Sequence, residues 1–190
     1  MLVFLISISR DHSKGLKSAL KYGIDVYCNQ DVADSFNGDK RRINIIEPLK
    51  NFTIGGFTIL PFDCQHTNND GSVCPNLGFL ISHKALGKVL FATDTYYLKY
   101  TFKGLEHVLI ECNYTERDLE KIPIYKIRTI KSHMSLETLK ETLKTWDLSN
   151  TKDITLIHLS GEYGDLNYFK EEIQKATGCI VNVAGPGVTI

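Results

Sequence analysis

The sequence predicts a layered α/β fold, because short apolar runs of strand length alternate with amphipathic runs of helical spacing. The strand-like runs gather in the middle of the chain, and the helix-like runs lie near both ends. This order favours stacked layers over a strictly alternating parallel sheet. With 43% hydrophobic and 23% charged residues, the composition excludes disorder, collagen and a long coiled coil. We expect a single domain over residues 1–190.

The N-terminal part of the chain opens with an apolar, β-rich run at residues 2–8, which predicts a strand. Residues 13–22 predict a helix, because Leu16, Ala19 and Leu20 recur at helical spacing while lysines occupy the other side. A second helix is predicted at residues 30–36. Further strands are predicted at residues 25–28, 42–46, 52–54 and 57–61.

The rest of the chain begins with a polar, glycine-containing stretch at residues 67–75, which predicts a loop. Residues 135–143 predict a helix that begins after Ser135, whose hydroxyl suits an N-cap, and residues 166–176 predict another. A Gly-Pro-Gly turn at residues 185–187 precedes a final strand. Strands are also predicted at residues 78–82, 88–92, 107–111, 153–157 and 180–184.

Charge and cysteine usage bound the setting in which the protein works. The 22 basic and 22 acidic residues cancel, which argues against a strong sequence-independent grip on nucleic acid. Five cysteines with no C-x-x-C spacing exclude a disulfide framework and a closed thiolate zinc site, so we expect a reducing, cytoplasmic setting. The opening apolar run of nine residues is too short to span a membrane and lacks signal-peptide anatomy, so no membrane partner is expected.

Several predicted strands end in a side chain that can bind a metal ion. These side chains are Asp11 and His12, then His66, Asp94 and His158. Rigid strands fix the side chains that follow them at a sheet edge, and this nitrogen and oxygen set suits zinc, manganese or iron. Each residue also has a structural alternative, since Asp11 could simply cap the helix that follows it. The joint pattern indicates a metal site.

At these positions the sequence resembles the metallo-β-lactamase fold hydrolases over nearly its whole length. The segment DHSKGLKSALKYGIDVY is similar to the family's metal-binding helix and the strand after it, and PFDCQH, LFATDT and LIHLSGEYGD are similar to later metal-ligand motifs. LIECNY and SHMSLETL resemble the phosphodiesterase branch, which includes ribonuclease Z-like and YycJ-like exonuclease proteins and phage enzymes that hydrolyse cyclic nucleotides.

The resemblance implies a four-layer αββα sandwich with zinc or manganese at one edge between the two sheets. It implies a nucleotide or nucleic-acid substrate and catalytic roles for Asp94, Glu111 and His133. Asp94 would hold the metal and orient a water, while the Glu111–His133 dyad would donate a proton to the leaving oxygen. The metal ligands that it implies are Asp11, His12, His66, Asp94 and His158.

The chain departs from the family pattern in two ways. Ser7 and Ser9 stand where the family has two histidines, and hydroxyls are poor zinc ligands. The chain also starts directly in the motif strand, so the sandwich is expected to lack its first strands. We therefore expect one bound ion rather than two, and a loss of about 10²–10⁴ in rate relative to a two-metal enzyme. The short sheet would leave an exposed edge suited to a homodimer.

Structural alternatives exist for the other candidate residues. His133 precedes a predicted helix, where a histidine is often only solvated, and Glu111 could cap a helix around residues 115–121. A nucleophilic pair of Cys64 and His66 lacks an orienting third group. The positive residues 40–42 suit a solvated strand start better than a phosphate groove. Two roles would suit Tyr96, Tyr97 and Tyr100: they could stack on a base of the substrate, or they could cover the edge of the core.

The sequence thus predicts a metal-dependent hydrolase of a phosphodiester, either a nucleic-acid end or a cyclic nucleotide. A thioester or lactone hydrolase of the same fold is a second hypothesis, which the pairing of Glu111 with His133 disfavours. A degenerate, non-catalytic member with one structural metal or a binding partner is a third hypothesis, which Ser7 and Ser9 support.

Overall fold

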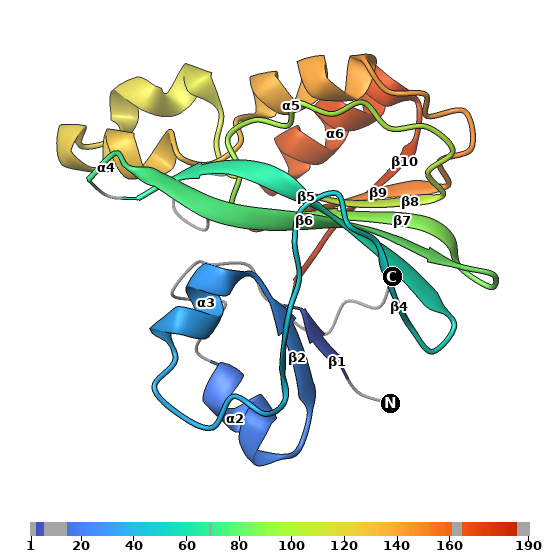
Figure 1. Ribbon diagram of the computed structural model, residues 1–190. Coiled ribbons are helices and arrows are strands. Elements are labelled where there is room, and N and C mark those ends of the chain that lie inside the picture. Colours follow the sequence, from blue (N-terminus) through green and yellow to red (C-terminus); the bar gives the residue numbers. More distant parts are fainter. Residues whose placement is uncertain (1–2, 6–14, 69, 161–164, 186–190) are drawn as a thin grey trace.

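The computed structural model describes residues 3–5, 15–68, 70–160 and 165–185 (Figure 1). Within these ranges two sheets face each other, and helices cover the outer face of each. The layers run from α2 (Leu16–Lys21) and α3 (Gln30–Ser35), through a small and a large sheet, to α5 (Leu136–Lys144) and α6 (Leu166–Thr177). The predicted four-layer αββα order is therefore confirmed.

The small sheet is parallel, with the order β1-β2-β3. Its strands are β1 (Val3–Leu5), β2 (Asp25–Cys28) and β3 (Ile43–Ile45).

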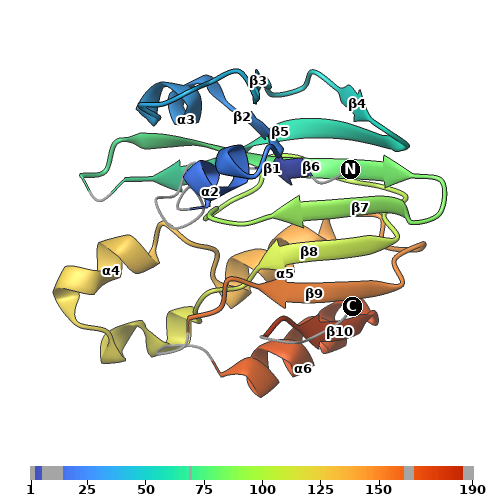
Figure 2. The same cartoon turned by 90° about the horizontal axis from the view of Figure 1, so that it is seen from below.

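The large sheet has the order β10-β9-β8-β7-β6-β5-β4, antiparallel from β4 to β7 and parallel from β7 to β10. Because β7, β8 and β9 are parallel, their carboxyl ends meet at one edge, beyond which α4 lies (Figure 2). The strands are β4 (Phe52–Ile54), β5 (Phe57–Thr67), β6 (Val73–His83), β7 (Gly87–Ala92), β8 (His107–Glu111), β9 (Asp153–Ile157) and β10 (Ile180–Val183).

Alternation along the strands builds a core on each side of each sheet. Val26 of β2 packs with Leu16 of α2, whereas its neighbour Tyr27 faces the large sheet and stacks on Phe52 at 5.2 Å between ring centroids. On the large sheet, Leu90 of β7 faces α5 and α6 and Phe91 faces the small sheet. Side chains at successive strand positions point to opposite faces, so each sheet is held from both sides.

The two helices over the large sheet begin and end as their sequences predict. Ser135 caps α5 by accepting a hydrogen bond from the Thr138 amide at 3.1 Å, and Asp165 caps α6 in the same way. Gly178 ends α6 in the left-handed conformation, at φ 72°. The α5 cap fixes the chain just after His133. The longest described helix has 12 residues, and none in those ranges could span a bilayer.

The region of residues 57–75 differs from the prediction. The structure extends β5 to Thr67 and starts β6 at Val73, so the predicted loop shrinks to the turn between them. The two strands pair without a break from Thr58↔Ser82 to Thr67↔Val73. Continuous backbone pairing outweighs the polar composition there. Cys74 and Asn76 are buried on one face of β6, whereas Val73 and Pro75 on the other face are exposed.

A connection between β8 and α5 contains elements that the sequence pattern predicts only in part. A 3₁₀ helix spans Glu116–Lys121, close to the helix expected around residues 115–121. The helix α4 (Ile124–Ile130) was not predicted, because it exposes Ile124 and Tyr125 and so has no clean apolar stripe. The predicted final strand after residue 187 lies outside the described residues.

Candidate metal centre

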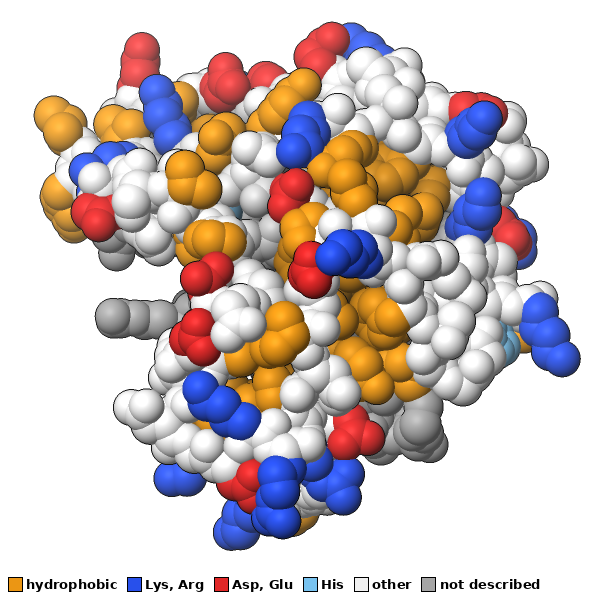
Figure 3. Space-filling view, in the orientation of Figure 1, with side chains coloured by type: hydrophobic (Ala, Val, Ile, Leu, Met, Phe, Trp, Pro, Cys, Tyr) orange, Lys and Arg blue, Asp and Glu red, His pale blue; other side chains and the backbone are white. Residues whose placement is uncertain are grey.

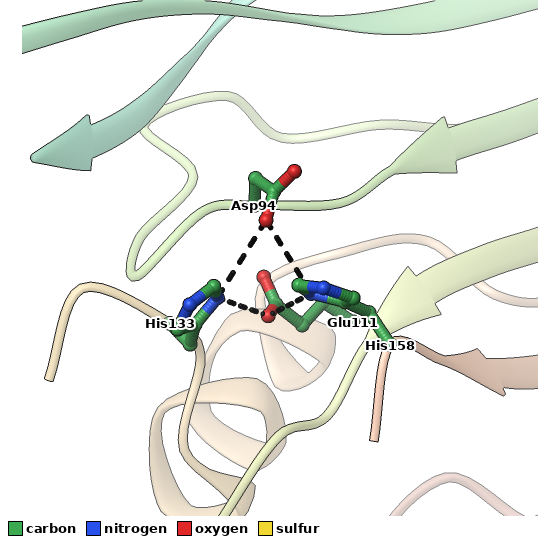
Figure 4. Close-up of side chains that lie close together, drawn as sticks. All are labelled: Asp94, Glu111, His133 and His158. Atoms are coloured by element: carbon green, nitrogen blue, oxygen red, sulfur yellow. Dashed lines mark hydrogen bonds and ion pairs between the residues drawn. The ribbon is translucent and has the colours of Figure 1, made fainter. Parts of the chain in front are cut away.

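Three strand ends and one loop bring four ionisable side chains together (Figure 4). Asp94 follows β7, Glu111 is the last residue of β8, and His158 follows β9. His133 arrives from the loop between α4 and α5. One ligand atom from each of the four residues lies within 4.8 Å of the others. Residues distant in sequence therefore converge on one point. Asp94 and His158 belong to the predicted strand-end set, whereas Glu111 and His133 form the pair that the family resemblance implied.

Glu111 is the centre of this group. Its side chain is 0% exposed, and Oε1 lies 2.7 Å from Nδ1 of His133 and 2.8 Å from Nδ1 of His158. Its other oxygen accepts a hydrogen bond from the amide of Thr95 at 2.7 Å. An ionised carboxylate only accepts, so both histidines carry the proton on Nδ1 and the lone pair on Nε2.

The short distances also bear on how Glu111 could act beside a metal ion. Two ligands at ~2.1 Å from a tetrahedral ion lie ~3.4 Å apart, which is longer than either Glu111–histidine separation. The carboxylate therefore orients the two imidazoles by hydrogen bonding, as outer carboxylates do around metal-ligating histidines.

Asp94 closes the group from the opposite side. Its Oδ1 lies 3.5 Å from Nδ1 of His158 and 3.8 Å from Nδ1 of His133, which are ion-pair rather than hydrogen-bond distances. The side chain is 2% exposed. At these distances Asp94 faces the Nδ1 edge of both rings. Together the four side chains offer carboxylate oxygens and imidazole nitrogens, the donor types that suit zinc, manganese or iron. The residues present thus fit the metal that the fold family implies.

His66, at the outer end of β5, extends the row of imidazoles. Its ring centroid lies 5.3 Å from that of His133, which in turn lies 5.0 Å from that of His158. Nδ1 of His66 donates to the carbonyl of Ser132 at 2.9 Å, because a carbonyl oxygen can only accept. The third histidine therefore also carries its lone pair on Nε2, at the place predicted for a further ligand.

Two site residues have unusual backbone conformations. Asp94 has φ 50° and His158 has φ 54°, and they are two of the three non-glycine residues with positive φ in the described ranges. Each such residue costs about 1–3 kcal/mol. A side-chain amide holds each carbonyl in place: Asn76 donates to Asp94 at 2.8 Å, and Asn113 donates to His158 at 2.7 Å.

The sequence did not predict these two asparagines. Asn76 lies inside β6, where asparagine is disfavoured, so its position was a usable signal. Nothing in the sequence marks Asn113, because its partner is 45 residues away. The sequence paired Glu111 with His133, and the structure adds the second hydrogen bond to His158.

Asp11 and His12, the other two predicted ligands, lie outside the described residues, as do Ser7 and Ser9. Their place at the site stays a prediction, and so do the roles of the residues that the structure brings together.

The thiols beside the site lie in the core. Cys64 and Cys112 are buried, and burial raises the pKa of each thiol well above its usual range. The alternative of a nucleophilic pair between Cys64 and His66 is therefore disfavoured.

The tyrosines after Asp94 divide into two kinds. Tyr100 packs edge-on against Phe62 at 5.7 Å, so it covers the core edge. Tyr96 and Tyr97 remain exposed.

Comparisons with known proteins agree with this architecture. No protein-family model and no curated protein matches the sequence. Among solved structures, the metallo-β-lactamase fold protein YhfI from Bacillus subtilis superposes with a TM-score of 0.71 at 18% identity, over 98% of this chain and 76% of that one. Zn²⁺-bound PqqB from Methylobacterium extorquens gives 0.73 at 13% identity, over 99% and 72%.

The short form of human tRNase Z is also similar, with a TM-score of 0.62 at 15% identity over 99% of this chain and 78% of that one. The chain thus spans about three quarters of each of these three structures. The protein has the metallo-β-lactamase fold, as the sequence predicted.

Proposed function

We propose that the protein is a metal-dependent hydrolase of phosphodiesters. The observation that carries the proposal is the pair of hydrogen bonds that buried Glu111 accepts from His133 and His158. One carboxylate thereby orients two imidazoles that have different predicted tasks, one beside a metal and one beside the leaving group. The similarity to tRNase Z supports phosphodiesters over other substrates of the fold.

A divalent ion, when bound, supplies Lewis-acid activation of a water nucleophile and offsets phosphate charge. In the proposed site, Asp94 and His158 would hold the ion together with Asp11 and His12. His66 and Asp94 would mark the second, weaker position. We expect a single ion, zinc or manganese, because Ser7 and Ser9 replace two histidines.

His133 would act as the general acid. In its protonated form it donates Nε2–H to the leaving oxygen, while Glu111, at 2.7 Å from Nδ1, stabilises the imidazolium. Both groups sit on the same side of the buried Asp94 carboxylate, and Glu111 also fixes the orientation of the His133 ring.

The test compares two substrates with leaving groups of different basicity. With Mn²⁺ or Zn²⁺ present, His133→Asn should lower kcat by about 10²–10⁴ for an alkoxide-leaving nucleotide phosphodiester. It should change turnover of bis-p-nitrophenyl phosphate much less, because p-nitrophenolate needs no proton to leave. Equal losses on both substrates would overturn the acid role. Stoichiometric metal binding without turnover of either substrate by the unaltered protein would instead support a non-catalytic metalloprotein.

A further inference from the structure

A basic groove lies on the far side of the small sheet from the large sheet, between α2 and the segment that leads into β3. It has a volume of about 820 Å³. Basic side chains gather over this lower edge of the molecule (Figure 3). The cations that line the groove are Lys17, Lys21, Arg41 and Arg42.

The groove has a positive excess although the whole chain is neutral. Two carboxylates line it: Asp39 pairs with Arg41 at 2.6 Å, and Asp25 pairs with Arg42 at 2.9 Å. Lys17 and Lys21 form no ion pair within the part of the chain that the structure describes. Four cations against two anions leave a local charge of 4 − 2 = +2. These two lysines therefore dominate the potential in the groove.

The two walls of the groove come from segments that are apart in the sequence. Lys17 and Lys21 are four residues apart, so they project from the same face of α2. The opposite wall contains the half-buried ring of Phe36. Gly38 packs closely against this ring, because a Cβ atom at Gly38 would lie only 2.6 Å from it. Residues 40–42 are exposed and lead into β3, in agreement with the predicted solvated strand start, and the structure adds the two lysines of α2 to the same groove.

We propose that this groove binds the phosphate groups of a nucleic-acid strand. The inference rests on the proposed phosphodiesterase function, and it narrows the substrate to a nucleic-acid strand. Cations along a groove are the usual element that binds the successive phosphates of a strand. The four cationic side chains are exposed, so water and salt screen each contact, and affinity requires several phosphates at once. A strand supplies successive phosphates, whereas a mononucleotide supplies one group.

Fluorescence anisotropy with a labelled 20-nucleotide single strand in EDTA tests the groove without any metal at the catalytic site. At 50 mM salt, Lys17→Gln/Lys21→Gln should raise Kd about tenfold and reduce the slope of log K against log salt by about 1.4. The matched control is Lys170→Gln/Lys175→Gln on α6, which removes the same charge from exposed positions in the opposite outer layer. Its Kd should stay within about twofold of the unaltered protein, because α6 lies outside the groove.

Equal weakening in both double variants would overturn the groove and indicate a diffuse charge effect. Competition by AMP at the same concentration of phosphate groups as the strand would also overturn it, in favour of a small-nucleotide site. Failure of the protein to hydrolyse any phosphodiester would refute the proposed function but leave this binding measurement unaffected.

Discussion

Replacement of Glu111 by glutamine tests how the site is organised. Glutamine has nearly the same shape but only one oxygen that can accept hydrogen bonds. If this oxygen takes the place of Oε1, it keeps the hydrogen bonds from His133 and His158. The amide nitrogen then takes the place of Oε2, 2.7 Å from the Thr95 nitrogen, so that two N–H donors face each other. The opposite orientation keeps the Thr95 contact and loses both histidines.

The first orientation costs less free energy, because it loses only the hydrogen bond from Thr95. A hydrogen bond to a charged group contributes about 1.5–3 kcal/mol. The free energy of unfolding of the metal-free Glu111→Gln protein should therefore fall by about 2 kcal/mol, or about 4–8 °C in Tm for a chain of this size. Metal affinity should fall about 10–100-fold, because the imidazoles lose the charge that fixes their Nδ1 protons. Urea titration measures the first quantity, and competition with a chromophoric chelator measures the second.

Glu137→Gln is the matched control. Glu137 is a half-buried carboxylate that accepts from the Thr115 hydroxyl at 2.6 Å and from the Glu116 amide at 2.9 Å, and neither partner is a histidine. It should lower stability by about 1–2 kcal/mol without changing metal affinity. An unchanged metal affinity in Glu111→Gln, or an equal loss in Glu137→Gln, would refute the assignment of Glu111 as the residue that orients both histidines.

Three further predictions follow from named contacts. Asn113→Ala should lower metal affinity about tenfold, because the carbonyl of His158 loses its 2.7 Å hydrogen bond; a loss of Tm with unaltered affinity would show that Asn113 has no part in the site. Ser135→Ala should lower the free energy of unfolding by about 1 kcal/mol in urea, since the Thr138 amide loses its cap, and no change would mean that water replaces it. All five cysteines are buried, and burial raises the pKa of Cys28 to about 11, which leaves about one thiolate per thousand at pH 8. Ellman's reagent at that pH should react with five thiols in guanidinium and with none in minutes in the native protein, so rapid native reaction would contradict the packing.

The strands and the site edge could be predicted because they depend on local pattern. The runs at residues 25–28, 107–111 and 153–157 are short and apolar, and the structure gives the same bounds. Asp94 and His158 follow such strands, and parallel pairing then brings their ends together without further information.

Features that depend on pairing at long range could not be predicted. The outer half of the β5–β6 hairpin has a polar sequence, and some of its side chains bind partners far along the chain, such as Asn76 with the carbonyls of Thr93 and Asp94. The contact of Glu111 with His158 spans 47 residues, and the groove joins α2 to the segment before β3. These contacts depend on how the layers stack, which the residue pattern along one element does not contain.

Anomalous diffraction from crystals soaked in Zn²⁺ tests the central claim most directly, since it locates the ion itself. The account predicts a zinc peak about 2.0–2.2 Å from a carboxylate oxygen of Asp94 and from Nε2 of His158. Glu111 should still accept its hydrogen bonds from Nδ1 of His133 and of His158. A zinc peak elsewhere, or none at full soaking, would contradict a metal centre at this edge of the sheet.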